Sequence, residues 1–215
     1  MNRRWLRWIW LLLALEAGRW FLGVSRYCFD FPGVVDRSRP ILIRGKYERG
    51  ILVIQQGKRW LYFPQLTTYA KLNEILNRSA SPPGAYRTPE GKLVDTQGRT
   101  LLSEIHELSV FAYSPEQELL VWGTPPGENP YGLNIRYQGK ERFIPTWDIY
   151  ALQIRPDGTI WLAESGIDSG VAVLNQKGQF LGWRAFGYPA GSVEQFAEVS
   201  DTEMSLMSRL VPGIN

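Results

Sequence analysis

The sequence predicts a mainly β protein that repeats a four-stranded unit about four times, complete or incomplete, with one or two short helices and an N-terminal membrane helix. Three observations support this prediction. Strand–turn–strand patterns recur about every forty residues along the body of the chain. Aromatic residues are abundant, with nine Trp, ten Tyr and nine Phe, and their flat rings pack well on a pleated sheet. An apolar run follows three arginines at the start of the chain.

The composition limits the classes of function. The 215 residues are enough for one ordinary domain with a sizeable core. The formal charge of +3 results from 24 basic and 21 acidic residues, and Arg3, Arg4 and Arg7 account for the surplus. The body of the protein is therefore close to neutral and offers no basic face for nucleic acid. Cys28 is the only cysteine in the sequence, so no intrachain disulfide can form.

Residues 1–24 fit an export segment in two ways. As an uncleaved anchor, about twenty residues suffice to span a hydrocarbon core, and tryptophans near both ends suit the interfaces. These anchor residues are Trp5, Trp8, Trp10 and Trp20. As a signal peptide, the segment would instead be cleaved near Ala17 and the domain secreted. We favour the anchor, with a cytoplasmic N-terminus and an extracytoplasmic domain, periplasmic or extracellular, by the positive-inside rule.

The chain after this segment divides into a linker, a β domain and a tail. Residues 25–40 contain Pro, Gly and charges and are predicted to be a linker. The β domain covers residues 41–190, and apolar residues at helical spacing predict a helical insertion over residues 67–78. A capping-box pattern at residues 192–195 predicts a short helix in a C-terminal helical tail over residues 191–215. Its inward residues would be Val193, Phe196 and Val199.

Internal repetition within the β domain defines its architecture. Turn glycines follow one another at intervals of 41, 41 and 39 residues: Gly57, Gly98, Gly139 and Gly178. Pro115 and Pro156, which begin two other turns, are also 41 residues apart. A four-stranded propeller blade has this period, and one blade cannot bury both faces alone, so blades must stack. The repeat therefore predicts a propeller-like domain, with a β-sandwich as the alternative.

Residues 148–166, DIYALQIRPDGTIWLAESG, resemble a blade of NHL-repeat or gluconolactonase-type propellers. Looser copies bring the resemblance to about residues 109–186. Such families usually carry more blades than fit here, so a four-bladed ring and a half-ring completed by a second copy both stay open. The resemblance implies a divalent metal held by the Asn of a P-N-G-L turn. Here that turn reads Pro130-Tyr131-Gly132-Leu133, and a tyrosine cannot replace the Asn ligand, which weighs against a lactonase.

Few residues suggest chemistry. Glu164 and Asp168 flank a loop and are the candidate for a Ca²⁺ site, but the usual role of such residues in capping turns is the favoured interpretation. His106 is the only histidine in the sequence, so a triad or a multi-histidine zinc site cannot form within one chain. Four aromatic residues near loops are candidates for a contact surface, with core packing as the favoured alternative: Trp122, Tyr131, Trp147 and Tyr150.

These patterns predict a non-catalytic, membrane-anchored accessory or assembly subunit of a membrane protein complex. Its partners would be the membrane, other subunits of the complex or a second copy of the chain, and no cofactor is predicted beyond the candidate Ca²⁺. A metal-dependent hydrolase or lactonase is the alternative that rests on the blade resemblance alone. An exported glycan-binding module is a second alternative, which a rim of exposed aromatic side chains would favour.

Overall fold

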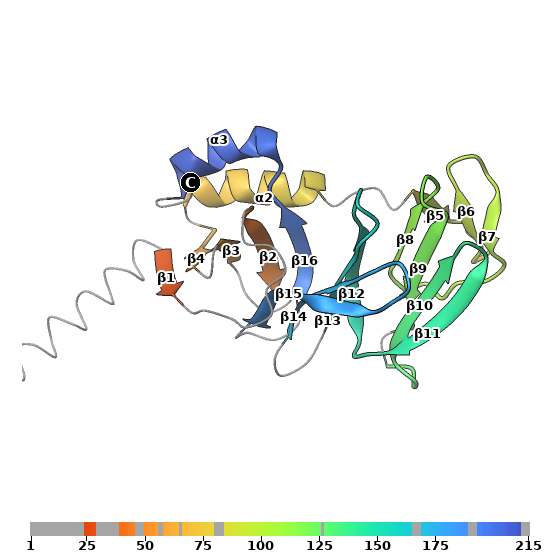
Figure 1. The fold of residues 1–215 in the computed structure, drawn as a ribbon. Helices are drawn as coiled ribbons and strands as arrows, with labels where there is room; N and C mark the ends of the chain where they lie inside the picture. The colour runs from red at the N-terminus through yellow and green to blue at the C-terminus, as the bar shows by residue number, and fades with distance from the viewer. Residues whose placement is uncertain are drawn as a thin grey trace, which may run out of the picture.

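The structure is a computed structural model that describes residues 24–28, 39–45, 50–55, 58–64, 66–79, 84–125, 127–164, 169–188 and 193–211. These residues form four antiparallel sheets and two helices, so the predicted mainly β class is confirmed (Figure 1). The sheets hold five, four, four and three strands, which is consistent with a repeat of four-stranded units. The described part of the chain thus contains four sheets and not the two of a β-sandwich.

The first sheet combines strands from both ends of the chain. Its strands are β1 (Val24–Cys28), β2 (Ile41–Gly45), β3 (Ile51–Gln55), β4 (Lys58–Tyr62) and β16 (Val193–Glu198). They lie in the order β1-β4-β3-β2-β16, and each neighbouring pair is antiparallel. The strands β2 and β3 are continuous apolar runs because both faces of this sheet are buried.

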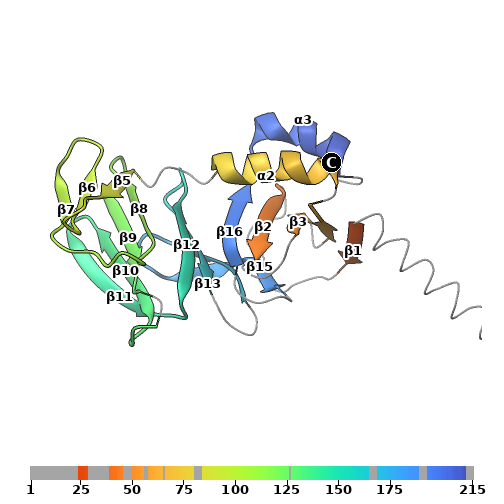
Figure 2. The same cartoon turned by 180° about the vertical axis from the view of Figure 1, so that it is seen from behind.

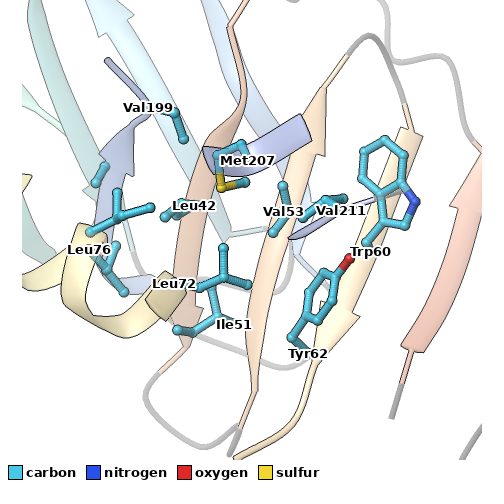
Figure 3. Packing of buried hydrophobic residues seen from close by; sticks show 12 residues of the cluster. Leu42, Ile51, Val53, Trp60, Tyr62, Leu72, Leu76, Val199, Met207 and Val211 are labelled. Atoms are coloured by element: carbon cyan, nitrogen blue, oxygen red, sulfur yellow. The ribbon is translucent and has the colours of Figure 1, made fainter. Parts of the chain in front are cut away.

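Two helices, α2 (Thr67–Ser79) and α3 (Asp201–Leu210), cover one face of the first sheet (Figures 1 and 2). The helix predicted for residues 67–78 is therefore present. Its apolar spacing places Leu72, Ile75 and Leu76 against Leu42, Val53 and their neighbours on the sheet (Figure 3). Tyr62 lies in the same cluster, and burial raises the pKa of its hydroxyl to about 12.

The other three sheets are built from strands that are consecutive in the chain. The second sheet holds β5 (Ala85–Arg87), β6 (Leu93–Asp95) and β7 (Thr100–Leu102). The third holds β8 (Phe111–Ser114), β9 (Leu119–Gly123), β10 (Gly132–Tyr137) and β11 (Lys140–Pro145). The fourth holds β12 (Ile149–Ile154), β13 (Ile160–Glu164), β14 (Ser169–Leu174) and β15 (Phe180–Tyr188).

Four hairpin turns share one geometry, which the sequence predicts from a glycine in the fourth position. In each turn the glycine N–H donates to the carbonyl of the first residue, whose own N–H donates to the carbonyl of the fifth. The glycines lie at φ between 76° and 82°, where a side chain is unfavourable. The turns cover residues 88–92, 95–99, 155–159 and 175–179.

The turn glycines also show which strands of the sheets are equivalent. Gly139 and Gly178 join the third and fourth strands of the third and fourth sheets, and Gly98 joins β6 to β7. By this register β5, β6 and β7 are the second to fourth strands of their unit, and the described residues contain no first strand for it. The residues before β5 contain α2 instead. In the first sheet, the edge strand beside β2 is β16, which comes from the other end of the chain.

The sheets stack face to face in the order first, fourth, third, second (Figures 1 and 2). One buried cluster joins the first sheet to β13 and β14, and another joins the opposite face of the fourth sheet to the third. A smaller cluster joins the third sheet to the second. Among the described residues no buried cluster joins the first and second sheets, which lie at opposite ends of the row.

The short helix predicted from the pattern at residues 192–195 is wrong, because residues 193–198 form the strand β16. Ala197 and Val199 face the helices, whereas Phe196 faces the fourth sheet, so the segment alternates with the period of a strand. The three predicted inward residues are buried, but Val193 and Phe196 belong to a strand and Val199 directly follows it. The capping box occurs later, where Ser200 and Glu203 cap α3.

Strand β1 occupies the start of the predicted linker, where Val24–Cys28 pairs with β4. Residues 29–38 and the predicted anchor up to residue 23 lie outside the described residues. Within the described ranges, no helix has both the length and the apolar character needed to cross a membrane.

Two turn glycines allow a test of the stacking between the third and fourth sheets. At Gly139 an added Cβ would meet nothing within 4 Å, whereas at Gly178 it would lie 2.0 Å from Ile144 Cδ1. Both glycines have positive φ, so we expect Gly139→Ala to cost about 1–2 kcal/mol of unfolding free energy. Gly178→Ala should cost at least about 1 kcal/mol more, because it also displaces Ile144. Chemical unfolding would measure both; equal losses would contradict the inter-sheet contact.

Candidate binding groove

Edge strands of three sheets lie beside one another, with β12 between β8 and β16 (Figures 1 and 2). Two cavities of about 680 and 550 Å³ open along these strands. Leu152 and Gln153 of β12 line both cavities, so the cavities meet at this strand. We call the two cavities together the inner groove.

The inner groove is bounded by sheets from both ends of the stack. Arg87 of β5 and Phe196 of β16 line the smaller cavity, although their sheets share no buried cluster among the described residues. The larger cavity reaches Gly84, just before β5, and the turns that contain Gln117 and Pro156. The groove therefore follows the side of the stack on which β8, β12 and β16 lie.

Side-chain amides lie along the groove and bind backbone carbonyls. Gln153 is buried, and its Nε2 donates to the carbonyl of Phe196 at 2.9 Å, which links β12 to β16. Gln117 Nε2 donates to the carbonyls of Arg155 and Pro156, each at 3.0 Å. These bonds supply donors to carbonyls that the strand ladders leave unpaired.

Arg87 contributes a positive charge at one end of the groove. Its guanidinium donates to the carbonyls of Ser109, at 3.0 Å, and Glu107, and it lies 5.9 Å from the ring centroid of Phe111. No carboxylate of the described residues forms a salt bridge with Arg87. The carboxylate-bearing residue Glu107 also lines this cavity, but it is exposed.

An ion cluster lies between the first and fourth sheets. Glu198 of β16 pairs with Arg155, and its Oε1 lies 3.7 Å from Nη2 of Arg184. Both guanidinium groups lie over the ring of Trp161, at 4.9 and 5.8 Å from its centroid. The Arg184 side chain is 1% exposed and that of Glu198 is 6% exposed, so these charges depend on each other. The cluster fixes β16 to the fourth sheet.

None of the four aromatic residues proposed from the sequence lines the inner groove. Trp122 packs in the cluster between the third and second sheets, as the core-packing alternative predicts. Trp147 is 64% exposed, while Tyr131 and Tyr150 are half-buried. The groove residues Gln153, Gln117 and Arg87 were missed. The signal for Gln153 was a polar residue between the apolar neighbours Leu152 and Ile154.

The proposed metal residues can be followed only in part. Glu164 ends β13, and its Oε1 accepts a hydrogen bond of 2.7 Å from the hydroxyl of Thr146. Asp168 and the four anchor tryptophans lie outside the described residues. Among the residues that the structure describes, no group of three His, Cys, Asp or Glu side chains could hold a metal ion. His106 is exposed, and its Nδ1 accepts a hydrogen bond of 3.1 Å from the N–H of Leu108.

Comparisons of the chain with models of protein families, with curated proteins and with solved structures give no match.

The buried ion cluster leads to a stability prediction. Glu198→Ala removes the buried carboxylate that pairs with Arg155 and lies 3.7 Å from Arg184, which should lower the unfolding free energy by about 3–5 kcal/mol. Asp201→Ala is the matched control, because its carboxylate pairs with Arg39 at 2.7 Å but is 77% exposed. Such an exposed pair contributes at most about 1 kcal/mol. Chemical unfolding followed by tryptophan fluorescence would compare the two, and similar losses would contradict the buried cluster.

Glu164 leads to a pH prediction. Burial raises the pKa of its carboxyl above the ordinary value of 4.5, against the opposing hydrogen bond from Thr146. The folded state then binds the proton more tightly than the unfolded state, so this group's contribution to stability is lost as the pH rises through the folded pKa. Glu164→Gln removes the charge and keeps an acceptor for Thr146.

We expect the thermal midpoint of Glu164→Gln to exceed that of the wild type by an increasing margin as the pH rises from 4.5 towards neutrality. Thermal unfolding of both proteins across this range is the measurement. The exposed residue Glu104 provides the control, since Glu104→Gln should show a margin that does not change in this way. A constant margin for Glu164→Gln would contradict the assignment.

Proposed function

We propose that the protein is a non-catalytic accessory or assembly subunit of a membrane protein complex. Its N-terminal segment anchors it in the membrane, and its β domain lies on the extracytoplasmic side. The observation that carries the proposal is the inner groove, whose lining of backbone, amide and aromatic groups suits a bound polypeptide. The arginines and the apolar run within residues 1–24 support the anchor.

We also propose that the four sheets are blades of an open, propeller-like array. In this arrangement the first strands are innermost, which agrees with the contacts of β12 with β8 and β16. The C-terminal strand completes the N-terminal blade, and the inner groove follows the axis. The ring is open between the first and second sheets, which leaves the groove accessible to another polypeptide.

Exposed apolar side chains add support for protein contacts. Large apolar side chains are exposed on the second, third and fourth sheets and their loops: Tyr86, Leu108, Phe143, Trp147, Phe180 and Leu181. Aromatic side chains of this kind are enriched at protein interfaces. Leu108 also lines the smaller cavity of the inner groove.

Purification of the tagged full-length chain in a gentle detergent tests this function. We expect one or a few membrane proteins to co-purify in a fixed ratio, and we expect mass spectrometry to find an intact N-terminal segment. A chain that begins near Gly18 and purifies without partners would contradict the proposal. That result would instead favour an exported module.

A further inference from the structure

We infer that the inner groove binds an extended segment of the partner protein, which adds along β12 through backbone hydrogen bonds and pairs a carboxylate with Arg87. The inference rests on the proposed function, because it describes how the accessory subunit holds its partner.

The hydrogen bonds of β12 show which of its backbone groups face the groove. The N–H of Arg155 donates to the carbonyl of Thr159 at 2.9 Å, so Arg155 belongs to a hydrogen-bonded pair with the next strand. Because such pairs alternate along an antiparallel ladder, Gln153 bonds to β13, whereas Leu152 and Ile154 turn their N–H and C=O groups to the opposite edge. That edge lines the groove.

The neighbouring strand β8 has the same arrangement. The N–H of Gly123 donates to the carbonyl of Val110 at 2.9 Å, which places Ala112 and Ser114 in the hydrogen-bonded pairs with β9. Phe111 and Tyr113 therefore turn their backbone groups away from β9. Within the described part of the chain, no hydrogen bond satisfies the outward backbone groups of Leu152, Ile154, Phe111 or Tyr113.

The chain covers a different inner edge with its own side chain. The carbonyl of Phe196 on β16 faces inward, and Gln153 Nε2 occupies it at 2.9 Å. Gly84 packs against the carbonyl of Tyr113 on β8, whereas no described side chain bonds to the outward backbone groups of Leu152 and Ile154 on β12. Two successive outward residues of a strand are about 6.7 Å apart, which is the repeat of any extended polypeptide. An added strand can therefore bond to Leu152 and Ile154 together.

Charge and apolarity define the partner segment further. Arg87 carries a half-buried positive charge that no described carboxylate pairs with in a salt bridge. Its Nε is buried and has no hydrogen-bond partner among the described residues. Leu108, Val110 and Phe111 make the cavity around it largely apolar. The complementary segment therefore has an Asp or Glu side chain with apolar side chains at alternate positions.

Peptide binding to the full-length chain in detergent tests the inference. The probes are overlapping ten-residue synthetic peptides from the extracytoplasmic parts of the co-purifying proteins, with peptides from residues 1–38 of this chain as a second set. Fluorescence anisotropy would measure their affinity. We expect one contiguous partner segment to bind, and we expect it to contain an acidic residue.

Two pairs of variants distinguish strand addition from other modes of peptide binding. Ile154→Pro removes the N–H that faces the groove but keeps the ladder bonds of its neighbours, so it should abolish binding. Ile154→Ala is its control, because it also shortens the side chain but keeps the N–H. Arg87→Gln should weaken binding by about tenfold or more, whereas Arg87→Lys keeps the charge and should retain most of the affinity. Circular dichroism would confirm that each variant is folded.

The outcomes distinguish this inference from the proposed function. If partners co-purify but no partner peptide binds, or binding survives both Ile154→Pro and Arg87→Gln, strand addition is overturned and the accessory role stands. If the peptides of residues 1–38 bind instead, the occupant is this chain and the inference is wrong. If no protein co-purifies, the accessory role fails and the inference fails with it.

Discussion

The pairing of β16 with β2 holds together segments that are about 150 residues apart in the sequence. This one strand contributes to two layers. Ala197 and the following Val199 pack under the helices, and Phe196 packs against the fourth sheet. The same strand carries Glu198 to Arg155 and Arg184, and α3 begins three residues after it ends. Loss of the pairing would expose both buried clusters of the first sheet.

Stacking of the sheets determines where function can reside. The first and fourth sheets bury both faces, so many of their strand residues are apolar, and the third sheet also packs on both sides. A polar group buried between these layers needs a partner, as Glu198 and Arg184 have in the ion cluster. The outward backbone N–H and C=O groups of β8 and β12 can find a hydrogen-bond partner only from the groove side. In the described part of the chain the second sheet has no strand beyond β5, whose Arg87 lines the groove.

The elements that the sequence predicted correctly are those whose conformation depends on residues close to one another in the chain. The hairpin turns depend on a glycine at positive φ, and α2 depends on the spacing of Leu72, Ile75 and Leu76. The strand β16 was mistaken for a helix because residues 192–195 fit a capping box, whereas its conformation is set by pairing with the distant strand β2.

The candidate site was less predictable, because it too depends on contacts between segments that are distant in the sequence. Trp122 lies inside the protein because its face of the third sheet packs on the second sheet, and no local pattern indicates which face is covered. Tyr131 and Trp147 were correctly placed near loops, but they lie away from the groove. Gln153 and Arg87 become neighbours of one cavity only when the sheets stack, so strand-by-strand reasoning could not bring them together.

Hydrogen exchange of the C-terminal strand tests most directly whether β16 closes the first sheet. Mass spectrometry of the full-length chain would compare a peptide that covers residues 193–199 with one that covers residues 41–45. Paired strands of one sheet should open together, so we expect both peptides to exchange slowly and to lose protection at the same denaturant concentration. Fast exchange over residues 193–199, while residues 41–45 stay protected, would contradict the account.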